Sequence, residues 1–583
     1  MQIDIDKLFG LGFFSNLDYF FATNLAEISK ENSEIIKLSA ALVSKNSREG
    51  HLCIDILKMS NRAITIDNDS MNPDKFKLPE KKLWLNALKS SKIVGKTCDY
   101  PLVLDSDCRL YLARFFDYQQ RFVKNISQRV KYKSPGVDPG VLGIEINKHF
   151  DHFKKEFDQE KKAAIETQKD CVQKALKNNF LIIPGGPGTG KTYIADKIGA
   201  VFSNLSKQQT SLKIVYTAPT GKAASKFKSG LTIHRLLQIK TSVKTRKQYT
   251  EKKISADLVI IDEASMIDIA LMTKLLEAIP LSTKVIIFGD KNQLGSIETG
   301  SLFADICESE KLNNFIVNLD YNFRSGRKHG INKLARAINS GNVKEIETIF
   351  SSFNLKNYND LAFININDSS KIESDLKNII IKGYTPYFQE NNLELAHKKL
   401  GEFKILCCLR KSSSGSDNLN KITENLLQTS QIHGIKQSFL KSILMITKND
   451  YNKLLFNGDM GMLVKTKGEI KAFFQDKDSS LRSFNISQLK TFEHAFAITV
   501  HKSQGSEFDH VLLVLPSVSS PVLTRELLYT AITRARKKVT IAGSIDVIKH
   551  AAITHSKKLS NITKLLDKSI TYHKDNYHKD KNE

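Results

Sequence analysis

Short apolar runs that end in small or acidic residues recur along the chain from about residue 165 onward. The first series comprises FLII, KIVYTAP, DLVIIDE and KVIIFGD, separated by segments with helical spacing or loop composition. Because these runs are apolar on both faces, they are typical of strands buried in a parallel sheet. A second series, from about residue 313, includes KILCCL, HVLLVLP and KKVTIAG. The pattern therefore predicts an α/β fold with two successive parallel-sheet domains, at 165–312 and 313–562.

Other patterns flank and interrupt these two sheets. Residues 1–115 mix helical and extended spacing and predict a separate N-terminal domain, and a charged helical linker follows at 116–164. Polar and apolar residues alternate between glycine turns at 456–495, which predicts a small β-barrel inserted in the second sheet domain. A strongly basic stretch at 240–253 has the length of a hairpin. The polar, partly repeated tail at 563–583 is expected to be disordered.

Charge and cysteine usage narrow the class of partner and the compartment. Lys and Arg outnumber Asp and Glu by 87 to 62 over 583 residues, a formal net charge of +25. Such an excess favours a polyanionic partner, nucleic acid ahead of an anionic membrane, although a lysine-rich codon bias gives the same excess. The N-terminus lacks a signal-peptide pattern and no apolar run approaches the ~18 residues that cross a bilayer, which predicts a cytoplasmic protein. With no CxxC pair and no zinc spacing, the seven cysteines are expected to be reduced thiols without a metal cluster.

The stretch PGGPGTGKTYIADK contains the pattern GxxxxGK[ST]. A predicted strand precedes it, and apolar residues recur at helical spacing after it. A strand, a glycine-rich loop and a helix N-terminus surround phosphates with backbone N–H groups. Lys191 is expected to neutralise the β- and γ-phosphates of ATP, and the Thr192 hydroxyl to ligate Mg²⁺. The predicted loop comprises Gly185, Gly186, Pro187, Gly188, Thr189, Gly190, Lys191 and Thr192.

Acidic and amide side chains follow two of the other predicted strands. DLVIIDE places Asp262 at a strand end, where its carboxylate can reach the Mg²⁺ beside Thr192. Glu263 is then expected to polarise the attacking water as general base. KVIIFGDKNQLGSIETG carries Gln293 beyond the tip of the next strand, where its amide can sense the γ-phosphate. The alternative for Asp262 and Glu263 is that they are two solvated acids at a strand end. Together with the glycine-rich loop, these side chains predict ATP hydrolysis.

Two further motifs suggest what the hydrolysis drives. YTAPTGKAASKF follows another predicted strand, and Pro219, Thr220 and Lys222 are expected to grip a phosphodiester chain together with backbone amides. TIHRLL places His234 and Arg235 near the same face. Either motif alone is equally consistent with an ordinary helix start.

The second sheet domain contributes two candidate arginine fingers. LDYNFRSGRKHG contains Phe323 and Arg324, and LTRELLYTAITRARKK contains Arg534. An arginine in a basic protein is usually a surface residue. These two are flanked by apolar helices and small residues, which favours side chains that reach the γ-phosphate from across a cleft.

The ordered set of motifs carries a resemblance to a known family. From Gln168 through GGPGTGKT, APTGKAA, TIHRLL, DEASM, GDKNQLGSIETG, YNFRS, VHKSQGSEF and YTAITRAR, the chain resembles superfamily-one DNA helicases of the 5′-to-3′ branch. Within that branch it is similar to the RecD subunits of the RecBCD enzyme, the alpha chains of exodeoxyribonuclease V. The resemblance covers nearly the whole chain and implies two tandem RecA-like P-loop domains, a partner-docking N-terminal domain and a small SH3-like β insert.

The resemblance also implies roles for individual residues. Gln168 is expected to read the adenine edge and Phe323 to stack on the adenine ring. Gly505 and Glu507 are expected near the nucleotide, and Gln293 is expected to couple the nucleotide state to DNA. Three residues of VHKSQGSEF are expected near single-stranded DNA: His501, Lys502 and Ser503.

At the level of the whole protein, the resemblance implies an ATP-dependent helicase in a heterotrimer with RecB-like and RecC-like subunits. It would unwind broken duplex ends for recombinational repair and DNA degradation. The basic hairpin at 240–253 occupies the place of a strand-separating pin, with Tyr249 as its aromatic residue. No cluster of acids and lysine suggests a nuclease site in this chain, so cleavage is assigned to a partner subunit.

Three alternatives are open at this stage. A stand-alone helicase of the same branch would carry a longer N-terminal extension. A P-loop kinase would leave VHKSQGSEF and AITRAR unexplained. A non-catalytic assembly subunit is disfavoured because Lys191, Asp262, Glu263 and Arg534 are all present.

Overall fold

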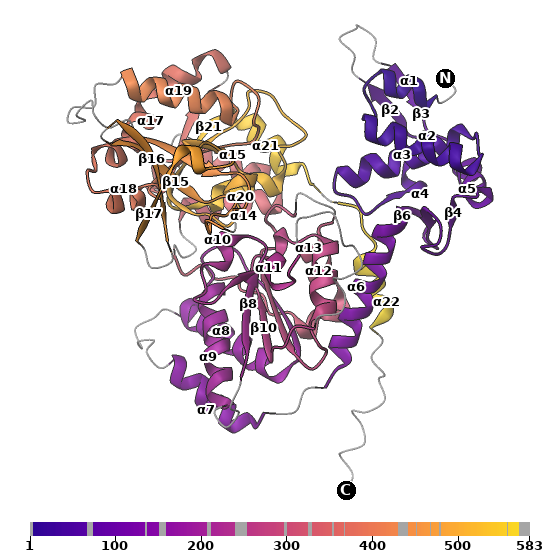
Figure 1. The fold of residues 1–583 in the computed structure, drawn as a ribbon, viewed down its shortest axis with the longest axis horizontal. Coiled ribbons are helices and arrows are strands. Elements are labelled where there is room, and N and C mark those ends of the chain that lie inside the picture. The colour runs from indigo at the N-terminus through magenta and orange to yellow at the C-terminus, as the bar shows by residue number, and fades with distance from the viewer. Residues whose placement is uncertain are drawn as a thin grey trace.

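The computed structural model arranges the chain as an N-terminal domain and two sheet domains, with the second sheet domain above the first in Figure 1. The residues that it describes are 4–66, 74–133, 137–150, 159–206, 212–239, 253–296, 300–324, 329–351, 355–366, 368–429, 441–450, 452–466, 468–476, 480–556 and 558–570. The predicted basic hairpin, including Tyr249, lies outside these ranges except for Lys253.

The N-terminal domain packs helices on a small sheet. Its helices are α1 (Ile5–Gly10), α2 (Asn16–Ser29), α3 (Glu34–Arg48), α4 (Ile56–Met59) and α5 (Lys81–Ser90). The sheet has the order β1-β6-β5-β4, formed by Cys53–Asp55, Arg109–Leu112, Leu102–Leu104 and Val94–Gly95, and β2 (Ala63–Ile66) pairs with β3 (Asp74–Lys77). The fully buried Trp84 donates from Nε1 to Ser39 Oγ at 2.7 Å, so the indole N–H is satisfied inside this core.

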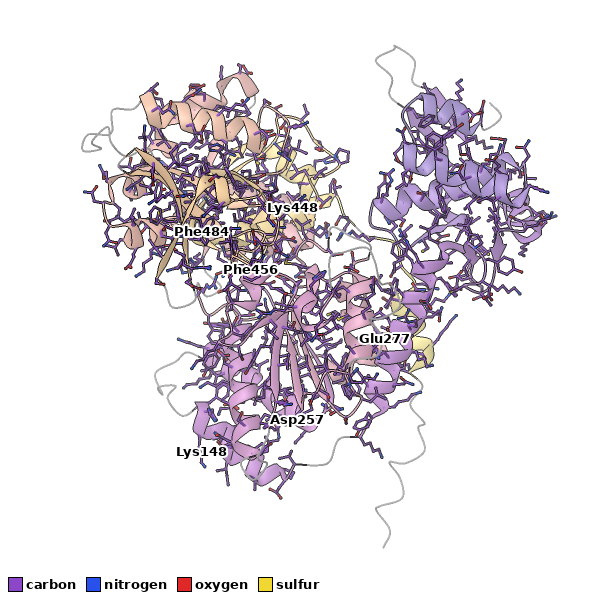
Figure 2. The ribbon with its side chains drawn as sticks, in the orientation of Figure 1. Lys148, Asp257, Glu277, Lys448, Phe456 and Phe484 are labelled. Carbon is purple, nitrogen blue, oxygen red and sulfur yellow. The ribbon has the colours of Figure 1, made fainter. Side chains whose placement is uncertain are left out.

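Three helices connect this domain to the first sheet: α6 (Ala113–Lys131), α7 (Pro139–Phe150) and α8 (Gln159–Lys177). The predicted helical linker at 116–164 is helical at 116–131, 139–150 and 159–164. Helix α6 packs against α12 (Ile269–Ala278) of the first sheet domain. Arg121 forms an ion pair of 2.5 Å with Glu277, which Figure 2 labels beside α6. Helix α6 therefore belongs to the first sheet domain and is not an independent spacer.

The first sheet is parallel and has the order β7-β11-β10-β8-β9. Its strands are Phe180–Pro184, Lys284–Gly289, Leu258–Ile261, Ile214–Ala218 and Leu231–Thr232, and the strands predicted from FLII, KIVYTAP, DLVIIDE and KVIIFGD are all present. The helices are α9 (Lys191–Leu205), α10 (Gly221–Ala224), α11 (Ile233–Leu236), α12 and α13 (Leu302–Cys307). Because parallel strands end at one edge, the residues after β7, β8, β10 and β11 meet there.

The second sheet is also parallel, with the order β12-β21-β20-β13-β19. Its strands are Leu361–Asn365, Ala535–Gly543, Phe508–Val514, Phe403–Cys407 and Ala497–Thr499. Its helices are α14 (Gly330–Ser340), α15 (Val343–Phe350), α17 (Ile372–Gln389), α18 (Leu393–Lys399), α19 (Ser416–Thr429), α20 (Arg525–Thr533) and α21 (Ile545–Ile553). The two-sheet α/β architecture is confirmed.

The predicted β insert is a five-stranded antiparallel sheet with the order β17-β16-β15-β14-β18. Its strands are Leu481–Asn485, Glu469–Gln475, Met460–Thr466, Lys441–Ile446 and Phe492–His494. The predicted start at residue 456 is wrong because β14 belongs to this sheet. Both faces of β14 are buried, Ile443 against the second-domain core and Leu444 in a separate small core, so its pattern resembles that of a parallel strand. Closure of this sheet into an SH3-like barrel stays a prediction.

The predicted disordered tail begins too early. Residues Ile562–Ser569 form α22, which packs against α6 and α13. Ile562, Leu566 and Ile570 lie four residues apart and are buried, so one face of this short segment is apolar. Just before it, the backbone N–H of Leu52 donates to the carbonyl of Leu559 at 2.8 Å. The chain thus returns from the second sheet domain to the first and to the N-terminal domain.

The structure also bears on what the sequence predicts for the cysteines, for a metal cluster and for a membrane span. All seven cysteines are free thiols, and four of them, Cys53, Cys171, Cys407 and Cys408, are buried. Within the described ranges, no group of three or more His, Cys, Asp or Glu side chains is arranged to hold a metal ion. Among the described helices, none has both the length and the apolar character that a membrane span requires.

Candidate active site

The loop between β7 and α9 is shaped by two glycines with positive φ. Gly188 has φ +79° and Gly190 has φ +88°, a region that favours glycine. A Cβ on Gly190 would lie 2.7 Å from Nε2 of Gln168, so the loop and the buried amide are packed closely. Lys191 at the start of α9 donates from Nζ to the carbonyls of Gly185 and Gly186, at 2.5 and 3.1 Å. Its ammonium therefore lies inside the curve of the loop, where a phosphate would bind.

Asp262 and Glu263 are buried at the end of β10, with exposures of 2% and 7%. Glu263 has φ +52°, and its backbone N–H donates to Asp262 Oδ1 at 2.8 Å. A non-glycine residue in this region is uncommon and is strained unless its surroundings hold it. Lys226 holds the side chain, with Nζ 3.0 Å from Glu263 Oε1.

The charges around this edge of the sheet are coupled. Burial raises the pKa of Asp262 and of Asp290, which follows β11. Burial also acts to raise the pKa of Glu263, but Lys226, Lys191 and Arg534 together outweigh it and lower the pKa. The positive charge of Lys191 acts on all three carboxyl groups, so the glycine-rich loop and the two acidic strand ends form one site.

The second sheet domain completes this site from across the interface. Arg534, which follows α20, donates from Nη2 to Gln293 Oε1 at 2.6 Å, and Gln293 Nε2 donates to Asp290 Oδ2 at 3.0 Å. The Tyr529 hydroxyl also donates to Asp290 Oδ2, at 3.2 Å. A further bond of 2.9 Å runs from the Leu294 N–H to Thr530 Oγ1. The loop after β11 is thus held by α20.

A cavity of about 240 Å³ lies beside the glycine-rich loop. Phe323 lines it from one side, with its ring 4.9 Å from the Tyr321 ring, and the Phe323 N–H donates to the Gly188 carbonyl at 2.9 Å. Gln168, which donates from Nε2 to the Thr189 carbonyl, lines the same cavity. An aromatic ring and a buried amide in one small cavity suit a flat heteroaromatic base.

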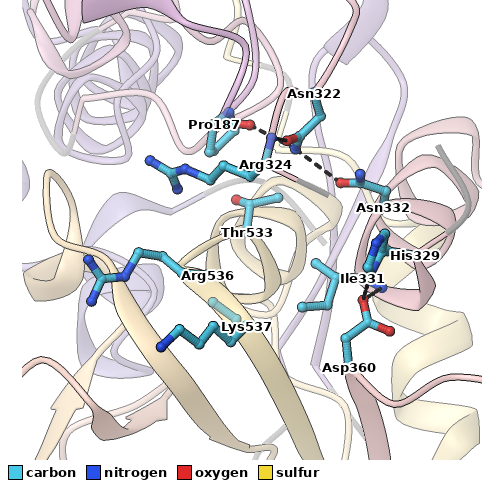
Figure 3. A pocket seen from close by; sticks show the side chains of 11 residues that line it. Pro187, Asn322, Arg324, His329, Ile331, Asn332, Asp360, Thr533, Arg536 and Lys537 are labelled. Atoms are coloured by element: carbon cyan, nitrogen blue, oxygen red, sulfur yellow. Dashed lines mark hydrogen bonds and ion pairs between the residues drawn. The ribbon is translucent and has the colours of Figure 1, made fainter. Parts of the chain in front are cut away.

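A second cavity of about 290 Å³ is lined in part by Asn322 and Arg324 (Figure 3). Asn322 Nδ2 donates to the Pro187 carbonyl at 3.0 Å and to Asn332 Oδ1 at 3.2 Å, which links the loop to α14. Arg324 lines this cavity and forms an ion pair of 2.7 Å with Glu507. Its guanidinium is therefore paired within its own domain, while the residues beside it in the chain contact the glycine-rich loop.

The residues predicted to bind DNA lie mainly where the two sheet domains meet. Lys222 donates from Nζ to Ser506 Oγ at 2.8 Å, and Thr220 Oγ1 lies 3.6 Å from where a Cβ on Gly505 would be. Phe456 of the β insert, labelled in Figure 2 at the edge that faces the first sheet domain, packs on Gly221. Pro219 is partly buried nearby and His234 is exposed on α11.

The three residues predicted near single-stranded DNA in VHKSQGSEF differ in how accessible they are. Lys502 is held by both carboxylate oxygens of Glu493, and His501 is partly buried. Ser503 is fully buried and its hydroxyl donates to the Val500 carbonyl at 2.7 Å. The short Ser503 hydroxyl therefore closes its own turn, and the expected position of Ser503 near single-stranded DNA stays a prediction.

Comparison with known proteins gives matches along the chain. Residues 10–111 match the N-terminal domain of RecBCD enzyme subunit RecD, 168–299 match an AAA domain, and 494–542 match the UvrD-like helicase C-terminal domain. The RecD subunit of Mycolicibacterium smegmatis is 26% identical over 94% of this chain and 97% of its own length. The RecD subunit of Buchnera aphidicola from Schizaphis graminum is 29% identical over 91% and 96%. The chain is a RecD-type helicase of superfamily one.

Among solved structures, the Pif1 helicase from Candida albicans is 15% identical, with a TM-score of 0.40, and the match covers 67% of this chain and 96% of that one. In this RecD-type chain, sequence motifs located the residues that converge at the edge of the first sheet: Lys191, Asp262, Glu263 and Gln293. They also located Arg534 and placed Gln168 and Phe323 together at one cavity.

Sequence reasoning missed three residues of the RecD-type site. Lys226 contacts Glu263, Tyr529 contacts Asp290, and Asn322 contacts Pro187. Lys226 lies in YTAPTGKAASKF, Tyr529 in LTRELLYTAITRARKK and Asn322 in LDYNFRSGRKHG, so each stands in a motif that also contains a predicted site residue. Their partners are distant in sequence, and spacing along the chain does not identify them.

Proposed function

We propose that this chain is an ATP-dependent 5′-to-3′ DNA helicase and translocase that works in a heterotrimer with RecB-like and RecC-like subunits. It acts in the cytoplasm on broken duplex ends, which it helps to unwind for recombinational repair and DNA degradation. The nuclease site belongs to a partner subunit. The observation that carries the motor function is the hydrogen bond between Gln293 and Arg534, because it connects the catalytic edge of one sheet domain to the other.

The residues at this edge fit a nucleotide with Mg²⁺. Asp262 and Asp290 are buried acids whose pKa values are raised by burial, so a divalent cation would supply the charge that stabilises their ionised forms. Thr192 and Asp262 would hold it. Bound Mg²⁺ neutralises charge on the β- and γ-phosphates. Lys191 binds the same phosphates, Glu263 accepts a proton from the attacking water, and Arg534 with Arg324 stabilises charge from the second domain.

Movement follows from the position of the DNA-facing residues on both domains. Thr220 and Lys222 belong to the first sheet domain, whereas His501 and Lys502 belong to the second. When the domains close and reopen with each turnover, the distance between the two grips changes. If the grips release alternately, the strand advances in one direction, which we propose to be 5′ to 3′.

The N-terminal domain has a surface suited to a partner subunit. Leu17, Phe20 and Ile28 are 63%, 53% and 81% exposed on α2. Their spacing of three and eight residues places them along one face of the helix. An exposed apolar stripe on a domain that matches the RecD N-terminal family supports docking of a partner at α2.

The motor function is tested by the ATPase rate of the full-length chain with and without single-stranded DNA. We expect DNA to stimulate the wild type, and Lys191→Gln to lower kcat by at least about 100-fold because the phosphate charge is no longer neutralised. Absence of any DNA stimulation in the wild type would reject the motor function. Unwinding of a 5′-tailed but not a 3′-tailed duplex tests the direction.

Docking is tested by co-purification with RecB-like and RecC-like subunits. Replacing Leu17, Phe20 and Ile28 by Ser should abolish assembly while leaving the DNA-stimulated ATPase of the chain intact. Leu83→Ser, at another exposed leucine of the same domain, is the matched control. Full assembly of the triple variant would show that partners bind elsewhere, and unwinding by the chain alone would favour a stand-alone helicase.

A further inference from the structure

An ion pair joins the DNA-facing surface of the first sheet domain to the residue proposed as general base. Lys226 Nζ lies 3.0 Å from Glu263 Oε1. Lys226 follows α10, four residues after Lys222, and Glu263 follows β10. Because β8, which leads into α10, is the direct neighbour of β10 in the sheet, the pair spans the tips of two adjacent strands. The ion pair therefore links the two loops directly.

The two members of the pair differ in their access to solvent. The Lys226 side chain is 36% exposed, whereas the Glu263 side chain is 9% exposed. A phosphate of a DNA strand that approaches from solvent therefore reaches the ammonium and not the carboxylate. Lys222, the other lysine of this motif, donates to Ser506 of the second sheet domain and is already engaged across the interface.

The pair also engages the carboxylate that the reaction needs. Glu263 Oε1 accepts from Lys226, and a general base must offer a carboxylate lone pair to water. The backbone of Glu263 is fixed by its φ of +52° and by the bond from its N–H to Asp262 Oδ1, so the direction of the side chain depends on its charged partner. In the part of the chain that the structure describes, Lys226 is that partner of the Glu263 carboxylate.

We propose that Lys226 is a positioning residue that holds Glu263 in an unproductive orientation until a DNA phosphate takes over the ammonium and releases the base. This inference rests on the proposed function, in which Glu263 activates water and DNA binds beside α10. Lys226 thus makes ATP hydrolysis conditional on DNA contact with the first sheet domain. A phosphodiester and an ammonium form a strong charge-assisted pair, which allows the exchange of partners.

The test compares ATP turnover of the full-length wild type, Lys226→Met, Lys226→Arg and Lys228→Met, with and without oligo(dT). Lys226→Met should raise the DNA-free kcat about fivefold, the factor expected on losing a partly exposed ion pair. Its kcat at saturating oligo(dT) should stay within about twofold of the wild type, and its KM for ATP should not change. Lys226→Arg should keep the low DNA-free rate. Lys228→Met, which removes an exposed lysine of the same loop, should behave as wild type.

The outcomes separate this inference from the proposed function. If oligo(dT) does not stimulate the wild type, the motor function fails. If it does, but Lys226→Met has an unchanged or lower DNA-free kcat at a thermal midpoint equal to the wild type, Lys226 does not restrain Glu263 and the inference is rejected. Lys226→Arg decides the case in which the methionine variant does not fold, because an arginine that releases the DNA-free rate also contradicts restraint by charge.

Discussion

Arg534 donates a hydrogen bond of 2.6 Å from Nη2 to Oε1 of Gln293, and this bond crosses from the second sheet domain to the first. The two side chains are 3% and 6% exposed. Nη1 of Arg534 also donates to the Ser506 carbonyl, so one guanidinium connects the loop after β11 to the segment that precedes β20. The arrangement makes the geometry of Arg534 important as well as its charge.

Arg534→Lys should lower the DNA-stimulated kcat about 1000-fold and change the affinity for ATP by less than about threefold. Lysine keeps the charge but has no planar fork that can contact Gln293 and Ser506 together. Steady-state ATPase assays and fluorescent-nucleotide binding measure the two quantities. Arg410→Lys, at an arginine whose side chain is 62% exposed, is the control. A near-normal kcat in Arg534→Lys would show that the bond to Gln293 serves packing alone.

Phe323→Ala should raise the KM for ATP about tenfold with kcat nearly unchanged. The ring lines the 240 Å³ cavity opposite Gln168, and loss of base stacking costs about 1–3 kcal/mol in both the ground and the transition state. Phe323→Tyr should restore the KM, because the ring is retained. If the alanine variant binds nucleotide normally, the base lies outside this cavity.

Much of this architecture could be predicted from the sequence because parallel strands leave a strong local signal. β7, β10 and β11 are apolar on both faces, and the polar residues that follow them must meet at one edge of the sheet. The glycine-rich loop adds a second local signal, since Gly188 and Gly190 adopt backbone angles that other residues avoid.

The remaining features depend on contacts that local patterns do not encode. Tyr529 and Asp290 are 239 residues apart, and nothing near either residue indicates the other. α22 is eight residues long and is held by its packing against α6, so its short apolar pattern resembled a solvated tail. The two faces of β14 are buried against different cores, so its sequence lacks the alternation of polar and apolar residues that marks the rest of the insert.

Arg129→Met should destabilise the protein by about 3 kcal/mol. Arg129 of α6 is 1% exposed and donates to the carbonyls of Leu276, Ile279 and Pro280, where α12 ends. Methionine fills similar space but donates no hydrogen bond. The Ile279 carbonyl then loses the donor that Arg129 supplies, whereas the carbonyls of Leu276 and Pro280 each keep another donor. Thermal unfolding measures the loss, and Lys124→Met at an exposed position of the same helix should have little effect. Equal midpoints for the two variants would contradict a capping role.

His510→Gln should make the protein less sensitive to acid. His510 of β20 lies 2.9 Å from Thr540 Oγ1, and burial, aided by Lys538, lowers its pKa from 6.5 to about 4. Between these values the unfolded chain binds a proton that the folded chain does not, so folding stability falls as pH falls from about 6.5 toward 4, and above 6.5 the histidine has no effect. Glutamine cannot take up this proton. Lowering the pH from 7 to 5 should therefore cost the wild type about 1 kcal/mol more than the variant, allowing for the partial exposure of the ring.

Thermal midpoints at the two pH values measure the difference, with His494→Gln, at an exposed histidine paired with Glu424, as the control. Identical pH dependence in wild type and His510→Gln would mean that His510 is protonated in the folded chain.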